Sequence, residues 1–460
     1  MFISMFSATD DELTQQRAAD VKDLKTSMLS ILLGVKEVKL SAAPKGTVVV
    51  AKELTPSMTA GINKENIVGI ITETGGKTSH SAILARALEI PAVLSVNGAV
   101  SKLSAGTYVI VDGSEGVVID EPDDAVIQEY DTKRINFLKE RKELENFRGK
   151  ATKALSGEEY ELFCNIGKPE DAIKAVDADG EGVGLFRTEF LFMDRTALPT
   201  EDEQFDAYKK AALTLKGKPV IIRTLDIGGD KEIPYLGLKK EENPFLGFRA
   251  IRYCLKHKDL FKTQLRAIVK ASAFGDVRIM FPLITAVEEL REGKALVEEV
   301  KAELREQGVE FNENIPVGIM TETSAAVMIA DILAKESDFF SIGTNDLTGY
   351  TMACDRGNDD VAYLYSPLQP SVLRGIKYII DCANKNNISV GMCGEAAANP
   401  MMVPLLMSFG LTEFSVSAPS VLKVRKTISA WSKAEADKVA EKVLAMTTEK
   451  EISDYLKTLL

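Results

Sequence analysis

The chain contains only two histidines, His80 and His257, so any chemistry that needs an imidazole depends on one of them. His80 stands in the run TGGKTSHSAILAR, in which the two glycines allow an unusual backbone turn and Thr78 and Ser79 are typical of a helix start. Free N–H groups and the positive end of the helix dipole at such a start favour a phosphoryl group carried on the imidazole. The alternative is a purely structural histidine. His257, in the run CLKHKDLF, lacks this setting and is expected on a helix surface.

A second group of reactive side chains lies where strand-like apolar runs end, from residue 155 onward. These runs end in, or lead into, Arg187, Glu189, Arg223, Asp226, Gly228, Gly229, Lys231, Glu322, Gly343, Asn345, Asp346, Cys393 and Glu395, and Arg356 is expected in the loop beyond the sixth run. Buried charges need partners, so apolar strands that end so often in charge are hard to explain as core alone. The alternative is that arginines and carboxylates pair there only to support loops.

The types of these residues favour a phosphorylated ligand. Arginine suits phosphate through its planar, bidentate guanidinium, and Arg187, Arg223 and Arg356 could converge on one anion. Glu322 and Asp346 follow successive strands and provide hard oxygen ligands, which suit Mg²⁺ when phosphate oxygens and water complete its shell. The pattern therefore predicts a site for a phosphorylated small molecule with Mg²⁺.

Cys393 closes a strand in the run GMCGE. An ordinary thiol has a pKa of about 8.5 and is mainly protonated near neutral pH. A proton donor is therefore a better interpretation than an unassisted nucleophile, because no histidine is nearby in the sequence to activate the sulfur. The alternative is a small buried hydrophobe. The chain's five cysteines form no CxxC pair, which predicts neither a disulfide framework nor a zinc site and favours a reducing cytoplasm.

The elements that must position these residues follow an alternating pattern. Eight strand-like runs alternate with helical segments, over Glu161 to Ile166, Gly182 to Phe186, Val220 to Leu225, Val277 to Phe281, Val317 to Met320, Phe339 to Ile342, Ser389 to Met392 and Phe414 to Ser417. Eight β/α units predict an α/β chain with a (β/α)₈ barrel, in which the active site lies at the carboxyl ends of the strands.

The N-terminal part has a different character. Residues 9–33 predict one helix, residues 38–120 predict a compact β-rich domain with a helix over 79–88, and residues 121–150 predict a charged, exposed helix that joins two domains. A plain solvated surface helix is the alternative for the last segment. We expect four parts, over residues 1–36, 37–120, 121–152 and 153–460.

Composition narrows the class of protein. The chain is 45% hydrophobic and 27% charged, as expected for a globular protein, and its net charge of −12 argues against a general nucleic-acid binder. No apolar run approaches the roughly 20 residues of a membrane helix. The first residues, MFISMFSATDDEL, are too short and too soon acidic for a signal peptide. These features predict a cytoplasmic protein.

Several long blocks, in order along the chain, strongly resemble Enzyme I of the bacterial phosphoenolpyruvate-dependent sugar phosphotransferase system. GGKTSHSAILAR is similar to the phosphohistidine signature of that family, and GLFRTEFLFM, RTLDIGGDK, NPFLGFRAIR, FFSIGTNDLTGYTMACDRGND and GMCGE are similar to its phosphoenolpyruvate-binding barrel. The resemblance implies a TIM barrel preceded by a β-rich swivelling phosphohistidine domain and a residual helix of the carrier-docking subdomain.

The resemblance also implies a reaction in which phosphoenolpyruvate phosphorylates His80 and leaves pyruvate. Cys393 would protonate the enolate at carbon three, and Glu322 and Asp346 would bind Mg²⁺. The substrate would contact Arg187, Arg223, Asn345, Asp346 and Arg356, with supporting contacts from Arg249 and Lys231. The family passes the phosphoryl group to the carrier protein HPr and dimerises through the barrel, so both partners are expected here.

The sequence departs from the family in several places. Part of the carrier-docking subdomain has no counterpart, so one alternative is a truncated form that binds phosphoenolpyruvate or phosphorylates itself but does not serve HPr. Thr323 and Ser324 replace an apolar residue and proline, and Asn399 stands where aspartate is usual.

Two other functions can be considered. A dikinase or synthase relative would need an ATP-binding domain, and no GxxxxGK[ST] motif is present. A non-enzymatic scaffold would leave the charged strand ends without a task.

Overall fold

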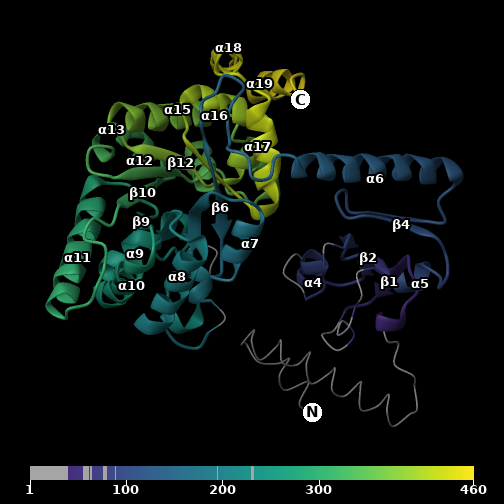
Figure 1. Cartoon of the computed structure of the whole chain (residues 1–460), viewed down its shortest axis with the longest axis horizontal. Coiled ribbons are helices and arrows are strands. Elements are labelled where there is room, and N and C mark those ends of the chain that lie inside the picture. Colours follow the sequence, from purple (N-terminus) through teal and green to yellow (C-terminus); the bar gives the residue numbers. More distant parts are fainter. Residues whose placement is uncertain are drawn as a thin grey trace, which may run out of the picture. The chain divides into compact units, whose positions relative to one another are not determined.

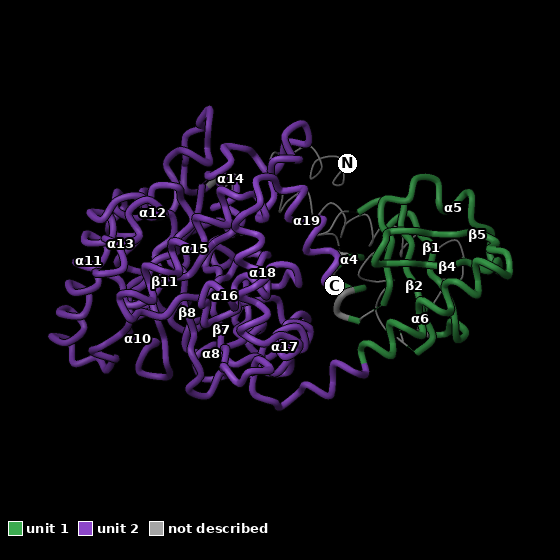
Figure 2. Tube along the Cα trace, turned by 90° about the horizontal axis from the view of Figure 1, so that it is seen from above, with its two compact units in different colours: residues 1–141 green, residues 142–460 purple. Residues whose placement is uncertain are grey.

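The structure is a computed structural model that describes residues 40–54, 58, 62, 65–75, 80–88, 90–193, 195–228 and 233–460. The helix expected over residues 9–33 lies outside this part of the chain. Two compact units, residues 1–141 and 142–460, are distinguished in Figure 2. Within the described residues, no helix is both long and apolar enough to cross a membrane.

The first unit contains a parallel sheet and a hairpin. Strands β1 (Thr47–Ala51), β2 (Ile67–Thr72) and β3 (Ala92–Val93) form the sheet in this order, and β4 (Val109–Asp112) pairs antiparallel with β5 (Val117–Asp120). Among the described residues that precede the hairpin, the helices are η1 (Leu40–Ala42), α4 (His80–Leu88) and α5 (Ala99–Lys102). Ile67, Ile70 and Leu54 are buried in a small core, as the β-branched runs of the sequence predict.

A long charged helix follows the hairpin. This helix, α6 (Asp124–Glu145), contains no buried residue and forms an i,i+4 ion pair between Lys133 and Glu129. Its length and exposure agree with the charged helix predicted over residues 121–150.

The second unit is a closed barrel of eight strands, and this confirms the predicted (β/α)₈ fold. The strands are β6 (Glu161–Ile166), β7 (Gly182–Arg187), β8 (Val220–Arg223), β9 (Val277–Phe281), β10 (Val317–Thr321), β11 (Phe339–Ile342), β12 (Ser389–Met392) and β13 (Glu413–Val416). Each strand pairs in parallel with the next one in the sequence, and β13 pairs with β6 to close the barrel. All eight carboxyl ends therefore lie at one face.

Helices surround the strands (Figure 1). They are α7 (Asp171–Asp177), α8 (Glu201–Leu215), α9 (Ala250–Lys256), α10 (Lys258–Ala271), α11 (Val287–Glu306), α12 (Ser324–Met328), α13 (Ala330–Leu333), α14 (Thr344–Met352), α15 (Pro370–Lys385), α16 (Val403–Phe409), α17 (Val421–Ser429), α18 (Lys433–Leu444) and α19 (Glu449–Lys457). Short 3₁₀ helices are η2 (Thr188–Leu191), η3 (Pro234–Leu236), η4 (Pro244–Leu246), η5 (Ser272–Phe274), η6 (Asp359–Leu364), η7 (Glu395–Ala398) and η8 (Ala418–Ser420).

The barrel interior has an apolar layer and a buried acid. Leu185, Ile221, Met280, Met320, Phe339 and Cys393 form the apolar cluster. Glu413 begins β13 and is 6% exposed, and its Oε1 has no hydrogen-bond partner within the described structure. Burial, assisted by the charge of Glu161 and opposed by Arg278, raises the pKa of Glu413 from 4.5 to about 8.

This buried acid makes stability depend on pH in a defined direction. Below about pH 4.5 the carboxyl of Glu413 is protonated in the folded and unfolded chains alike. Between about pH 4.5 and 8 only the folded chain keeps this proton, so the contribution of Glu413 to the free energy of unfolding falls as pH rises and levels off above the folded pKa.

We expect Glu413→Gln to remove this dependence, because glutamine fills the same space without ionising. The free energy of unfolding of the variant, relative to the unmodified chain, should rise by about 1–3 kcal/mol between pH 5 and pH 8. Urea unfolding at the two pH values measures this change. The exposed Glu441→Gln on α18 is the control and should show no such rise. A pH-independent difference for Glu413→Gln would contradict the prediction.

Candidate active site

Arg223 is buried at the end of β8 between two carboxylates. Its Nη2 donates to Oε1 of Glu189 at 2.8 Å, and its Nη1 lies 3.1 Å from Oδ2 of Asp226. The side chain of Arg223 is 8% exposed, and those of the two acids are 3% and 2% exposed. Burial opposes the charge of Arg223, but Glu189 and Asp226 outweigh it and raise the pKa of the guanidinium. A permanent positive charge is therefore fixed at this strand end.

Arg249 extends the network to a third strand end. Its Nη2 donates to Oδ1 of Asp226 at 2.8 Å and to Oδ2 of Asp346 at 3.2 Å, so one guanidinium links β8 to α14. Its Nη1 donates to the hydroxyl of Tyr350 at 3.3 Å, and that hydroxyl in turn donates to the carbonyl of Phe245. Burial lowers the pKa of Arg249 while Asp226 and Asp346 raise it, with a net increase. The arginine holds Asp346 in place at the barrel mouth.

Glu322 directly follows β10 and is 2% exposed. Its Oε1 accepts a hydrogen bond from the backbone N–H of Leu283 at 2.7 Å, and its Oε2 lies 2.7 Å from where a Cβ on Gly343 would stand. Burial first, and then the charges of Asp346 and Asp226, raise the pKa of Glu322 to about 8. The carboxyl therefore faces Gly343, which precedes the helix α14 that carries Asp346, in surroundings with too little positive charge to favour its ionised form.

This surplus of buried acid fits a divalent cation. The charge of Asp346 raises the cost of ionising Glu322, which a cation between the two carboxylates would offset. Among the described residues, no group of three or more His, Cys, Asp and Glu side chains is arranged to hold a metal ion. Two protein carboxylates suffice for Mg²⁺, which keeps several waters and binds phosphate oxygens of its substrate. The residues present therefore fit the predicted ion.

The backbone is strained beside this network. Leu283, which donates to Glu322, has a φ of 57°, and Ala250, which follows Arg249, has a φ of 54°. Non-glycine residues rarely adopt this left-handed conformation, and such strain collects at functional sites, where the surroundings hold it in place. The two residues thus mark turns that aim neighbouring groups at the barrel mouth.

Cys393 lies inside the barrel at the end of β12 and is 5% exposed. Its thiol points toward the carbonyl of Ile342, with Sγ and O 3.7 Å apart. Burial raises the pKa of the thiol to about 12, so the sulfur keeps its proton at neutral pH. A buried, protonated thiol suits proton donation and is poorly suited to nucleophilic attack.

The remaining predicted residues differ in their settings. Arg187 ends β7 with an exposed side chain whose guanidinium lies 5.1 Å from the centre of the Phe190 ring, and Arg356 is exposed on the loop after α14. Asn345, in the first turn of α14, accepts a hydrogen bond from the N–H of Glu395 at 3.2 Å. Both exposed arginines are therefore accessible to a ligand at the face that carries the buried network.

Two predicted residues cannot be placed in this geometry. Lys231 lies outside the described residues. His80 is the first residue of α4, as predicted, and belongs to the unit of residues 1–141. The structure describes its backbone but not its side chain. Two contacts were not predicted: Tyr350 on Arg249, and Asn165 of β6 beside Cys393. In the sequence, Asn165 could have been noticed as a polar residue between the apolar Cys164 and Ile166 of β6.

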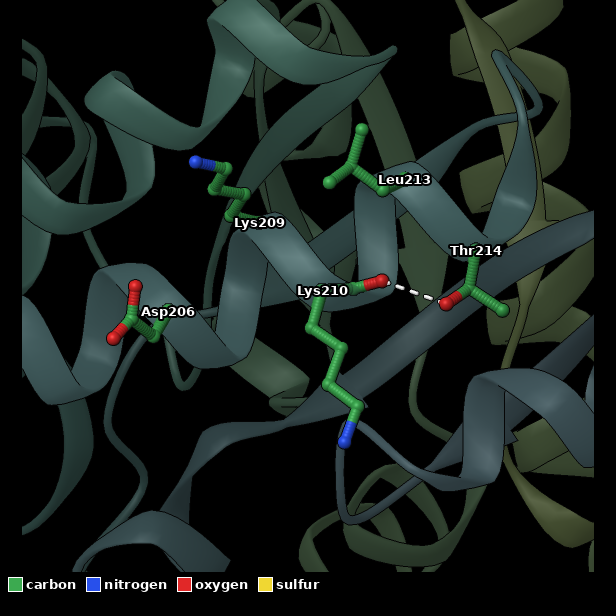
Figure 3. A pocket seen from close by; sticks show the side chains of 5 residues that line it. All are labelled: Asp206, Lys209, Lys210, Leu213 and Thr214. Carbon is green, nitrogen blue, oxygen red and sulfur yellow. Dashed lines mark hydrogen bonds between the residues drawn. The ribbon is translucent and has the colours of Figure 1, made fainter.

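A pocket on the outer helix α8 is a poorer candidate for the active site. It has a volume of about 410 Å³ and is lined by Asp206, Lys209, Lys210, Leu213 and Thr214, all from α8. Figure 3 shows that these side chains do not converge, and the bond drawn there joins the Thr214 hydroxyl to the Lys210 carbonyl at 2.7 Å. No strand-end residue lines it, so the network around Arg223 remains the candidate active site.

Comparison with known proteins identifies the family of both units. Residues 141–432 match the family model described as PEP-utilising enzyme, PEP-binding domain, and residues 43–116 match PEP-utilising enzyme, mobile domain. Three similar proteins are each named phosphoenolpyruvate-protein phosphotransferase. That of Priestia megaterium is 46% identical and covers 100% of this chain and 80% of its own length. Those of Geobacillus stearothermophilus and Bacillus subtilis (strain 168) are both 48% identical over 99% of this chain, and over 79% and 80% of their own.

Proposed function

The chain belongs to the phosphoenolpyruvate-protein phosphotransferase family, enzymes that move the phosphoryl group of phosphoenolpyruvate to a protein, and we propose that His80 accepts this group. The observation that carries the proposal is a phosphoenolpyruvate-binding barrel whose strand ends hold a buried arginine–carboxylate network. His80 lies in the first turn of α4, where free N–H groups favour a phosphate.

Substrate binding divides between exposed and buried arginines. We assign the phosphate and carboxylate of phosphoenolpyruvate to the exposed Arg187 and Arg356, with Arg223 and Asn345 beside them. Arg249 acts through its contacts to Asp226 and Asp346 rather than on the substrate. Lys231 remains a proposed supporting contact. Fixed positive charge of this kind stabilises the charge that develops during phosphoryl transfer.

Mg²⁺ is the proposed cofactor, with Glu322 and Asp346 as its protein ligands. When bound, the ion would neutralise charge on the phosphate oxygens of the substrate. Asp346, which also borders the substrate, is oriented by Arg249, and Glu322 is oriented by the Leu283 N–H.

Cys393 completes the reaction. Cleavage of the phosphorus–oxygen bond transfers the phosphoryl group to the His80 nitrogen and leaves the enolate of pyruvate. The electron pair of the broken bond stays on the enolate oxygen and re-forms the carbonyl. The π electrons of the carbon–carbon double bond then take the proton of the Cys393 thiol at carbon three, and the thiol becomes a thiolate. Burial keeps that proton on the sulfur until the enolate forms.

The two reacting groups belong to different compact units, so the reaction needs movement. We propose that residues 37–120 act as a swivelling phosphohistidine domain and that the helix within 121–152 is the arm on which it turns. Residues 153–460 form the phosphoenolpyruvate-binding barrel, and residues 1–36 are assigned to the carrier-docking part.

The proposed protein partner is HPr, and the proposed assembly is a homodimer through the barrel. The comparisons give no support to the alternative in which the phosphoryl group is not passed on. We place the protein in the cytoplasm because all five cysteines are free, as expected in a reducing compartment.

Transfer to HPr can be followed with phosphoenolpyruvate labelled in its phosphoryl group. With Mg²⁺ the chain should become labelled, and addition of purified HPr should move the label to HPr. The control omits Mg²⁺ and should give little label. Label that stays on the chain when HPr is present would remove HPr as the partner while leaving the first transfer intact.

A further inference from the structure

The amide of Asn165 makes three contacts that tie together separate strands inside the barrel. Its Nδ2 donates to the carbonyl of Cys393 at 2.9 Å and to the carbonyl of Ser415 at 3.3 Å. Its Oδ1 accepts from the hydroxyl of Ser415 at 2.7 Å. The side chain of Asn165 on β6 thus forms hydrogen bonds with Cys393, the proposed proton donor, and with Ser415 of β13.

Ser415 fixes the direction of this amide. Because its hydroxyl donates to Oδ1, the nitrogen end of Asn165 is left to face the Cys393 carbonyl. A Cβ on Gly184 of β7 would lie 2.5 Å from the Ser415 hydroxyl oxygen and 2.4 Å from Oε1 of Glu413. The bare backbone of β7 therefore makes room for Ser415 and confines it on that side.

The backbone of Cys393 is held on both sides. Its N–H donates to the Ile342 carbonyl of β11 at 3.1 Å, and its own carbonyl accepts from Asn165 of β6. The next residue is equally confined, because a Cβ on Gly394 would lie 1.8 Å from Oγ1 of Thr344. The peptide that carries the thiol is fixed in this way, and the sulfur itself lies 3.7 Å from the Ile342 carbonyl oxygen.

We propose that Asn165, oriented by Ser415, is a positioning residue that holds Cys393 so that its proton reaches one face of the enolate. The inference rests on the proposed role of Cys393. In this proposal Asn165 acts through the backbone of Cys393 and does not contact the substrate or the metal. Without Asn165, water rather than the Cys393 thiol would protonate the enolate, and both faces would react.

The stereochemistry of protonation at carbon three can be measured, and a general loss of stability does not change it. Phosphoenolpyruvate carrying deuterium at one defined position on carbon three, turned over in tritiated water, yields pyruvate with a chiral methyl group. The unmodified enzyme should give one handedness. Asn165→Leu, which keeps the volume but loses all three contacts, should give a largely racemic methyl group. We expect about 10- to 100-fold slower turnover with little change in the KM for phosphoenolpyruvate.

Controls separate this inference from the proposed function. Asn386→Leu removes another half-buried amide, which lies just before β12 begins and donates to the Cys382 carbonyl at 2.8 Å, and should leave the handedness intact. Ser415→Ala, which frees the amide while keeping Asn165, should lower the selectivity in part and serves if Asn165→Leu does not fold. One outcome would be racemic product from Cys393→Ser but full selectivity in both Asn165→Leu and Ser415→Ala. This outcome would overturn the role of Asn165 and leave the role of Cys393 intact. Full selectivity in Cys393→Ser would overturn the role of Cys393 and the inference with it.

Discussion

His80→Ala is expected to abolish labelling of the chain by phosphoenolpyruvate. Alanine has no nitrogen to accept the phosphoryl group, and the chain has only one other histidine. The expected loss is complete rather than partial, because no other side chain at the start of α4 is a comparable nucleophile. Incubation with labelled phosphoenolpyruvate and Mg²⁺, followed by gel separation, measures the label.

His257→Ala is the matched control for this experiment. His257 is exposed between α9 and α10, where its ring lies 4.3 Å from the ring of Tyr253, and its ring contacts within the described residues are to Phe248 and Tyr253. This variant should keep its label. Persistent labelling of His80→Ala together with loss in His257→Ala would reverse the assignment.

Glu322→Gln is expected to lower turnover of phosphoenolpyruvate by about 100-fold or more and to raise the Mg²⁺ concentration required. Glutamine has the same shape and can still accept the hydrogen bond from Leu283, so the barrel should fold. Because burial raises the pKa of Glu322, loss of its ionisable carboxyl should stabilise the folded chain above about pH 4.5. What is lost is the negative charge that would hold the cation. Turnover measured over a series of Mg²⁺ concentrations, with urea unfolding of the same samples, separates the two effects.

The exposed Glu306→Gln at the end of α11 removes the same charge outside the site and should behave as the unmodified chain. An unchanged Mg²⁺ requirement in Glu322→Gln would show that this carboxylate is not a metal ligand. A large loss of stability would instead attribute the fall in turnover to misfolding.

Much of the barrel could be predicted because its strands are short apolar runs bounded by glycine, proline or charge. The limits of β9 and β11 agree with those predicted. Strand β8 ends at Arg223 rather than at Leu225, since the backbone there turns to pair Arg223 with Asp226. Strand β13 begins one residue early, at Glu413, because a buried acid inside a barrel cannot be recognised from an apolar pattern.

The site was predictable in its residue types but not in its pairings. Charge at the strand ends pointed to Arg223, Glu322 and Asp346. It could not show that Arg249 connects Asp226 to Asp346, because the partner of a long side chain depends on its direction in space. The alternative that arginines there pair with carboxylates describes the buried Arg223 and Arg249, and the side chains of Arg187 and Arg356 are exposed. Asn165 was missed because its importance lies in contacts to strands more than 200 residues away.

Locating the phosphoryl group on the chain tests whether phosphoenolpyruvate phosphorylates His80. The chain is incubated with phosphoenolpyruvate and Mg²⁺, digested under alkaline conditions that preserve phosphohistidine, and its peptides are sequenced by mass spectrometry. We expect one modified peptide, with the phosphoryl group on His80. A phosphoryl group on His257, or on a serine or threonine with His80 unmodified, would contradict it.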